Sequence, residues 1–289
     1  MVFLLSAWHC SNIFYSCNVL WFKLSSFHKK YKHFQQPGIT TNEINSIVHD
    51  ETIKLGAFPS PLGYRGFPKS CCTSVNHVCC HGIPDDTELR DGDVINVDVS
   101  VFHRGYHGDT SDTFPVGNVD PVGELLIATA RDCLQAAIEC CGHGRLLSEI
   151  GSRVQVLADE RGFTVSKKFV GHGIGRHFHC LPQVRHYVNQ SEERMSEGMV
   201  MTVEPIVMEG RNESRATEDG WTEVSVDGLR SSQAEHTLVV TKDSCLVLTW
   251  NVKFCKYLFK EIYYCLFSQS FNFLFMVIFS YKFFKYKFY

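Results

Sequence analysis

The sequence predicts an α+β fold, in which helices alternate with antiparallel hairpins. Two observations predict it: helical periodicity over residues 41–55 and 121–161, and strict apolar–polar alternation over residues 94–101 ahead of a tight turn. A chain of 289 residues can bury one large core or two small ones. Helix-plus-hairpin patterns occur in both halves, although no repeat by identity is visible.

Three helices are expected. Residues 40–43 (TTNE) form a capping box ahead of apolar residues at helical spacing, and Gly56 closes this helix. A second helix is expected over residues 121–141, with a single apolar stripe made of Val122, Leu125, Leu126, Cys133, Leu134, Ala137 and Ile138. A third is expected over residues 148–161, with Ser148 as its N-cap.

The two ends differ from the middle of the chain. Residues 1–36 and 250–289 are rich in Phe, Tyr, Lys and Cys and lack the periodicity of residues 37–249. The run 262–281 carries no charge, and its 20 residues are long enough for a membrane-spanning tail. A buried terminal helix and translated non-coding DNA are the alternatives, and the A/T-rich codons of both ends favour the last. Residues 1–36 are accordingly a gene-model artefact or a targeting segment.

Charge and cysteine content exclude several classes of protein. The formal net charge of -3 provides no basic surface for nucleic acid, so no nucleic-acid partner is expected. Six of the 13 cysteines form adjacent pairs at 71–72, 79–80 and 140–141, which suit a reduced compartment better than a disulfide framework. No CxxC pair is present, so a structural zinc site is not expected.

The alternating segment places two aspartates on one face. A two-residue turn at residues 104–105 pairs residues whose numbers sum to 209, so Asp98 lies opposite Ser111 and Asp109 opposite Ser100. The aspartates are then diagonal neighbours roughly 7–8 Å apart. Two such carboxylates repel each other unless a cation lies between them. The alternative for this segment alone is an exposed polar face with scattered aspartates.

Three further residues strengthen the metal hypothesis. His172 lies in GHGIG, whose glycines allow close backbone approach and positive φ. Glu204 lies among apolar residues, where a glutamate must be paired, and Glu235 begins another strand pattern. Each alone could be a partnered core residue. Together with Asp98 and Asp109 they form an oxygen-rich set that could hold two divalent cations.

Several runs resemble the type I methionine aminopeptidases over about residues 37–249. They are PSPLGYRGFPKS, CCTSVN, CHGIPDD, DGDVINVDV, GYHGDTSDTF, FVGHGIGRHFH, TVEPI and AEHTLVVT. The resemblance implies a duplicated pita-bread fold, with a curved antiparallel sheet, outer helices and a site between the halves. It also implies a dinuclear ligand set of Asp98, Asp109, His172, Glu204 and Glu235. GYRGF is closer to organellar members than to cytosolic eukaryotic ones.

The resemblance also implies catalytic roles. Asp109 and Glu235 would bridge two metals, Asp98 would complete one, and His172 and Glu204 the other, so that a water molecule is acidified. Glu204 would pass the proton to the leaving amine. His81 and His179 would contact the scissile amide and stabilise its oxyanion. A turn-capping role is the alternative for His81.

Substrate selection is expected in an apolar pocket. The resemblance assigns substrate binding to His81 and His179 and to a sulfur-tolerant pocket for methionine formed by Tyr64, Phe67, Cys72, Phe178 and Trp221. The five pocket residues could equally be plain core residues. The preference for a small second residue is carried over from the family.

The expected function is removal of the initiator methionine by a monomer, with Co, Mn, Fe or Zn as metal. The partner would be the N-terminal methionine of nascent polypeptides, including chains at the ribosome, in the cytoplasm or an organelle. An inactive pita-bread binding protein and an Xaa-Pro-type peptidase are the alternatives. Two departures from the family stand out. No amphipathic pattern in residues 1–36 replaces the helix before PG-x-TT, and Cys180-Leu181 replaces residues that are often acidic.

Overall fold

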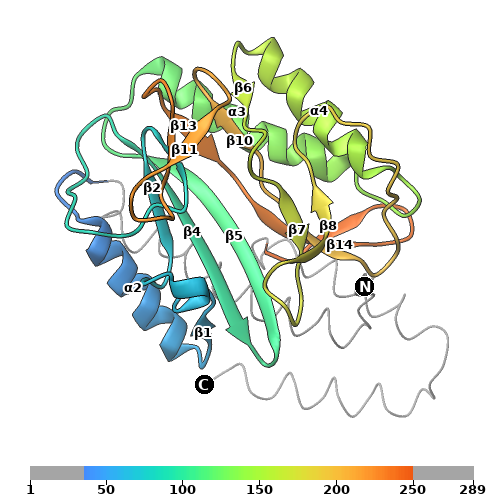
Figure 1. The fold of residues 1–289 in the computed structure, drawn as a ribbon, viewed down its shortest axis with the longest axis horizontal. Helices are drawn as coiled ribbons and strands as arrows, with labels where there is room; N and C mark the ends of the chain where they lie inside the picture. The colour runs from blue at the N-terminus through green and yellow to red at the C-terminus, as the bar shows by residue number, and fades with distance from the viewer. Residues whose placement is uncertain (1–35, 250–289) are drawn as a thin grey trace, which may run out of the picture. The chain divides into compact units, whose positions relative to one another are not determined.

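A long antiparallel hairpin organises the amino-terminal half of the structure, a computed structural model that describes residues 36–249. Its two strands, β4 (Val94–His103) and β5 (Tyr106–Pro115), cross the centre of Figure 1. Their register pairs Asp98 with Ser111 and Ser100 with Asp109, which confirms the predicted turn. Strand β4 also pairs with two short strands, β1 (Phe58–Pro59) and β2 (Cys72–Val75), in a four-stranded sheet.

Helix α2 (Thr41–Lys54) covers the apolar face of this sheet and begins at the predicted capping box. The Thr40 hydroxyl accepts from the Glu43 N–H at 3.2 Å, and the Glu43 carboxylate accepts from the Thr40 N–H at 2.8 Å. The helix buries Ile44 and Val48 in one cluster with the alternating apolar residues of β4, which are Ile95, Val97, Val99 and Val101. The other face of the hairpin is left for the polar residues.

Helices α3 (Pro121–Glu139) and α4 (Leu147–Glu160) pack against each other over the second half (Figure 1). The predicted stripe on α3 is partly wrong, because Val122 and Leu125 are 52% and 45% exposed. The first turn of α3 extends past the core, whereas Leu126 and the later residues of the predicted stripe are buried in the core or packed against it.

The predicted N-cap of α4 is also wrong. The helix begins two residues earlier than predicted, with Leu146 as N-cap, and Ser148 lies inside it. The carboxylate of Glu149 accepts a hydrogen bond from the Leu146 N–H at 3.0 Å. That bond satisfies an amide of the helix start, so a hydroxyl at position 148 is not needed for capping.

Three further sheets build the carboxyl-terminal half. A five-stranded sheet has the order β15-β14-β9-β7-β8, with β7 at Gly171–Gly173, β8 at Cys180–Val184, β9 at Val200–Val203, β14 at His236–Val240 and β15 at Cys245–Val247. A second has the order β13-β10-β6, with strands at Ser231–Gln233, Ile206–Met208 and Thr164–Val165. A third joins β11 (Ser214–Ala216), β12 (Glu223–Ser225) and β3 (Val78–Cys80). The predicted α+β class is confirmed.

The predicted domain range 37–249 nearly coincides with the described residues, and its boundaries stay a prediction. The interpretations of the two ends, including a tail anchor at 262–281 and the missing family helix, lie outside the described residues. No helix within residues 36–249 is long and apolar enough to cross a membrane. The nine cysteines in this range are free thiols.

The contrast between neighbouring leucines on α3 tests the packing. Leu126→Ala should lower the free energy of unfolding by about 2–5 kcal/mol, because Leu126 is completely buried. Leu125→Ala is the matched control and should change it by less than about 0.5 kcal/mol, since Leu125 is half exposed. Urea unfolding of both variants measures the difference, and equal losses would contradict the packing of α3.

Candidate active site

The five predicted metal ligands converge from five segments of the chain. Asp98 comes from β4, Asp109 from β5 and His172 from β7. Glu204 follows the last residue of β9, and Glu235 precedes the first residue of β14. The last two therefore lie directly at strand ends, which agrees with the strand pattern that Glu235 begins.

Hydrogen bonds join the hairpin to the segment that carries Glu235. The Glu235 N–H donates to the Ser111 carbonyl at 2.9 Å, and the Thr110 hydroxyl donates to the Glu235 carbonyl at 3.0 Å. The Thr237 hydroxyl donates to the Asp109 carbonyl at 2.7 Å and accepts from the Asp109 N–H at 3.0 Å. These bonds connect the two halves of the molecule directly at the acidic residues.

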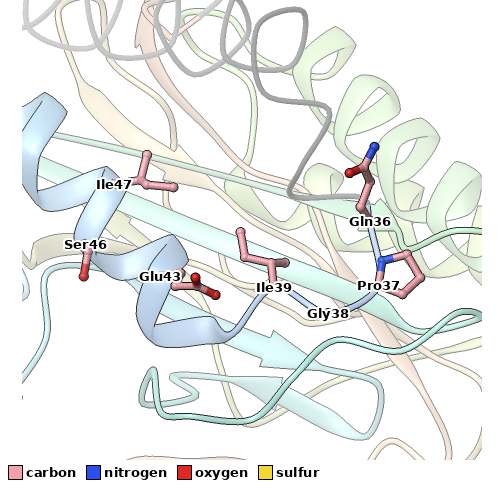
Figure 2. Close-up of a pocket in the computed structure, with 7 residues that line it drawn as sticks. All are labelled: Gln36, Pro37, Gly38, Ile39, Glu43, Ser46 and Ile47. Carbon is pink, nitrogen blue, oxygen red and sulfur yellow. The ribbon is translucent and has the colours of Figure 1, made fainter.

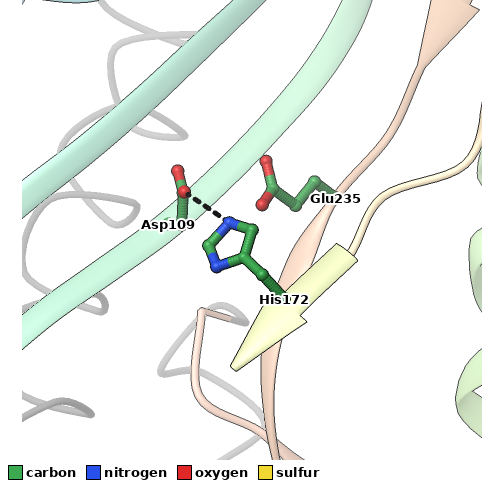
Figure 3. Close-up of side chains that lie close together, drawn as sticks. All are labelled: Asp109, His172 and Glu235. Atoms are coloured by element: carbon green, nitrogen blue, oxygen red, sulfur yellow. Dashed lines mark ion pairs between the residues drawn. The ribbon is translucent and has the colours of Figure 1, made fainter. Parts of the chain in front are cut away.

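The ligand atoms of Asp109, His172 and Glu235 all lie within 4.8 Å of one another, and Figure 3 shows the three side chains pointing toward a common centre. His172 Nε2 lies 3.8 Å from Asp109 Oδ2 and 3.6 Å from Glu204 Oε1. Asp98 Oδ1 is buried without a hydrogen-bond partner. Four carboxylates and one imidazole therefore share one small region.

Glycines allow His172 to reach this position. A Cβ at Gly171 would lie 2.4 Å from the Thr202 carbonyl oxygen, and one at Gly173 would lie 2.1 Å from the Leu181 carbonyl oxygen. The expected close approach is confirmed, but the expected positive φ is wrong, because none of the glycines at 171, 173 and 175 has one. The need here is for space between paired strands, not for a left-handed backbone.

The tautomer of His172 suits metal binding. Its Nδ1 lies 3.1 Å from the Gly173 carbonyl oxygen, which can only accept, so Nδ1 carries the hydrogen. The lone pair then resides on Nε2, the nitrogen that faces Asp109 and Glu204. Burial lowers the pKa of His172 to about 4, so the ring is neutral at physiological pH.

The four carboxylates lie close together in a largely buried region, where they repel one another. Burial first, and then the Asp109 charge, raise the pKa of Glu204 to about 8, and burial raises that of Asp109 to about 6. Burial and neighbouring carboxylates raise the pKa values of Asp98 and Glu235 well above the usual range. Within residues 36–249, no lysine or arginine forms an ion pair with any of the four.

These residues fit divalent cations. The unpartnered Asp98 oxygen, the free Nε2 of His172 and the crowded carboxylates are all groups that a cation would satisfy. An oxygen-rich set with one imidazole suits ions such as Mn²⁺, Fe²⁺, Co²⁺ or Zn²⁺.

Four residues that support the ligands were missed from the sequence. Ser100 donates to Asp109 at 2.6 Å, Thr202 donates to Glu204 at 2.8 Å, and Gln233 Nε2 donates to Glu204 Oε2 at 3.2 Å. Each lies two residues from a ligand, at positions 98, 204 and 235, so the period of a strand could have found them. The fourth, His186, accepts from the Glu204 N–H at 3.0 Å and carries no such signal.

A cavity of about 570 Å³ opens beside the ligands. It is lined by all five of them and by all seven predicted substrate-binding residues, which are Tyr64, Phe67, Cys72, His81, Phe178, His179 and Trp221. Tyr64 packs edge-on against Phe178 at 5.0 Å between ring centroids, and Phe67 against Trp221 at 5.2 Å. The structure therefore brings together the residues to which the sequence assigned a common site.

Two histidines border this cavity. His179 Nδ1 lies 2.9 Å from the Tyr64 hydroxyl, and its ring lies 4.2 Å from that of His172. His81 has a left-handed backbone, with φ of 56°, and its ring packs edge-on against Phe169 and Trp221. Burial is the first cause that lowers the pKa of both, to about 3 for His179, so both are neutral at pH 7.

A second cavity, of about 530 Å³, lies between residues 36–39 and the first turns of α2 (Figure 2). Its ionisable lining residue is Glu43, whose carboxylate caps α2. This cavity therefore offers no competing cluster of reactive groups.

A site of this kind, set on strands beside an aromatic cavity, is typical of metal-dependent hydrolases. The chain belongs to metallopeptidase family M24, whose family model matches residues 24–242. It is 52% identical over 211 residues to the human mitochondrial methionine aminopeptidase 1D and 46% identical over 216 residues to methionine aminopeptidase 1 of Saccharomyces cerevisiae. These matches cover 73% and 74% of this chain, but 63% and 56% of the relatives. The chain thus spans less than two thirds of their length.

Solved structures agree. The methionine aminopeptidase of Rickettsia prowazekii superposes with a TM-score of 0.83 at 36% identity, covering 86% of this chain and 100% of that one. The prolidase of Pyrococcus furiosus shares the fold alone, with a TM-score of 0.65 at 19% identity over 84% of this chain and 64% of that one. The predicted pita-bread fold and the resemblance to methionine aminopeptidases are confirmed.

The raised carboxyl pKa values predict how pH affects stability. A carboxyl whose folded pKa is about 6 or 8 has an unfolded pKa of about 4, so the folded chain binds more protons in this range. Above about pH 7, where the buried histidines with lowered pKa values are neutral in both the folded and the unfolded chain, metal-free protein should therefore lose stability as pH rises toward about 9. Added Mn²⁺ offsets the repulsion, so its stabilising effect on the melting temperature should grow from pH 5 to pH 8.

Scanning calorimetry with and without Mn²⁺ measures this effect. Glu235→Gln should flatten the pH dependence of the metal-free protein, because it removes one buried charge. Glu213→Gln is the matched control, since Glu213 is exposed and lies 4.0 Å from Arg211. A melting temperature of the metal-free protein that rises between about pH 7 and pH 9 would contradict the electrostatic account.

Proposed function

We propose that this chain removes the N-terminal methionine from polypeptides and prefers a small second residue. One observation carries the proposal: the complete ligand set and the aromatic residues line the same cavity. Chemistry and selection of an apolar side chain can therefore take place on one bound peptide. The high identity to proteins named methionine aminopeptidase supports the same substrate.

Two divalent cations are proposed to bind at the five ligands. Asp109 and Glu235 would be shared, Asp98 would serve one ion, and His172 and Glu204 the other. Such a pair supplies Lewis acidity and lowers the pKa of a water molecule to near neutrality. The site would also select chain termini, since a free amino group can bind to a metal ion and the nitrogen of an internal peptide bond cannot.

Glu204 is the proposed proton carrier. Thr202 and Gln233 each donate to one of its two carboxylate oxygens, so the carboxylate is held in one orientation. In the metal-free protein, burial raises the pKa of Glu204 to about 8, so this carboxylate binds a proton readily until a cation takes its place. It would accept a proton from the attacking water and deliver it to the leaving amine.

His81 and His179 are proposed to contact the scissile amide. When the Tyr64 hydroxyl donates to His179 Nδ1, the hydrogen of the neutral ring remains on Nε2. That N–H can donate to the carbonyl oxygen as its negative charge develops. His81 borders the same cavity from the side of Trp221 and would complete the contact with the amide.

The aromatic part of the cavity is proposed to bind the methionine side chain. Phe67, Phe178 and the Cys72 thiol are buried, and Tyr64 and Trp221 complete the lining. Burial raises the pKa of Cys72, so its thiol is neutral and offers a soft contact to a thioether, not a nucleophile.

The proposed partners are nascent polypeptides, including those emerging from the ribosome, and the proposed form is a monomer. The proposed setting is the cytoplasm or an organelle, and the names of the human and zebrafish relatives support a mitochondrial one. Cellular supply would decide which metal is used. The likeness to prolidases, at 17–19% identity, concerns the fold and gives no support to an Xaa-Pro activity.

Peptide hydrolysis tests this proposal. Protein loaded with Mn²⁺ or Co²⁺ should release methionine from Met-Ala-Ser and leave Ala-Pro-Ser intact, as measured by chromatography. Asp109→Ala should abolish turnover. His179→Ala should lower kcat about 10²–10³-fold, the usual loss for one oxyanion donor. His77→Ala is the matched control, since His77 is exposed and does not line the cavity, and it should leave kcat unchanged.

Release of alanine from Ala-Pro-Ser, or full activity of Asp109→Ala, would refute the proposal. A folded protein that binds the metal but cleaves neither peptide would support the alternative of an inactive binding protein.

A further inference from the structure

Arg65 lies at the cavity in an unusual backbone conformation. It is the central residue of the short 3-10 turn η2 (Tyr64–Gly66), with φ of 48° and ψ of 31°. Gly63, which precedes this turn, and Gly66, which ends it, are also left-handed, at φ of 81° and 87°. Glycine adopts this conformation readily and arginine does not, so the side chain at position 65 needs an explanation beyond the turn itself.

The Arg65 side chain is exposed and lines the cavity. Its guanidinium carbon lies 5.5 Å from the centroid of the Tyr64 ring, which contacts both Phe178 and His179. Its charge is among the causes that lower the pKa of His179, which places the guanidinium near that ring. Within residues 36–249, no carboxylate forms an ion pair with it.

The charge balance of the cavity leaves Arg65 uncompensated. The acidic lining residues are the four metal-binding carboxylates, and two divalent cations would neutralise them. The other fixed cation of the lining, Lys168, is paired with Glu223, with 2.6 Å between Nζ and Oε1. The metal-loaded cavity would therefore carry one net positive charge, at Arg65.

An extended peptide would bring its third residue toward this charge. Side chains of an extended chain alternate, so residues one and three project to the same side. The first side chain, methionine, would enter the pocket that Tyr64 lines, and Arg65 is the next residue along the chain and stacks on Tyr64. The side chain of the third residue then points toward the Arg65 side of the cavity mouth.

We propose that Arg65 is a specificity-determining residue that favours substrates with an acidic side chain at the third position. This inference rests on the proposed removal of N-terminal methionine. Because the guanidinium is exposed to solvent, the preference is modest and sensitive to salt.

The ratio of kcat/KM between a peptide with Glu and one with Lys at the third position measures the preference. The three peptides are Met-Ala-Xaa-Gly-Gly amides with Xaa as Glu, Gln or Lys, and the amide removes the terminal carboxylate. The wild-type protein should cleave the Glu peptide roughly two- to fivefold better than the Lys peptide at low salt, with the Gln peptide between them. The ratio should approach one at 0.5 M NaCl, and when the charged residue is moved to the fifth position.

Variants assign the preference to Arg65. Arg65→Gln and Arg65→Gly should both bring the Glu-to-Lys ratio to about one, and Arg65→Lys should keep most of it. Gly relieves the strain of the left-handed backbone at position 65, and Gln does not. If both variants lower the Glu-to-Lys ratio equally, the loss comes from the missing charge and not from a change in backbone strain. Arg176→Gln is the matched control, since Arg176 also stacks on a tyrosine, at 5.8 Å from the ring of Tyr106, but does not line the cavity. It should leave the ratio unchanged.

The outcomes separate this inference from the function on which it rests. If the Gln peptide is cleaved but the wild-type ratio is one, or if Arg65→Gln keeps the ratio, the role of Arg65 is refuted and the aminopeptidase function stands. An equal loss in Arg176→Gln would also refute it, because the preference would then reflect total charge. If metal-loaded protein cleaves none of the peptides, both proposals fail.

Discussion

The structure depends on the mutual repulsion of four carboxylates at the cavity and on the groups that can neutralise them. Asp98, Asp109, Glu204 and Glu235 are buried or half-buried beside one another, and burial is the first cause that raises the pKa of each. Such a cluster is unstable unless it is protonated or binds cations. Protons and divalent metals are thus two alternative solutions to one electrostatic problem, and they compete for the same oxygens.

The surrounding fold keeps these groups in place despite that repulsion. The paired bonds between Thr237 and the Asp109 backbone fix the hairpin against β14, and Gln233 and Thr202 fix the Glu204 carboxylate. Most of these supports come from strands, which deform less readily than loops. A site preorganised in this way does not need to rearrange when a metal or a substrate binds.

The sequence predicted the hairpin well, because a two-residue turn and a period of two leave a single register that buries Ile95, Val97, Val99 and Val101 together. It also singled out the five residues that the structure brings together as proposed ligands, since a charged residue within an apolar run requires an explanation. The sequence-based prediction failed where the observed contact depends on another residue that the local pattern does not reveal. Glu149 made the Ser148 cap unnecessary, and nothing in the sequence indicates that His186 contacts a residue 18 positions away.

The proposed metal ligands and two other residues of the cavity have different backbones. The proposed ligands lie in or beside extended strands, whereas Arg65, in the 3-10 turn η2, and His81, directly after β3, occupy left-handed positions. A strand fixes the direction of a side chain to one of two faces, which suits ligands that must meet within a few ångströms. A left-handed residue can aim a side chain where no strand or helix would place it. Turn sequence can therefore change around the cavity, and with it the preferred peptide, while the carboxylates and His172 remain unchanged.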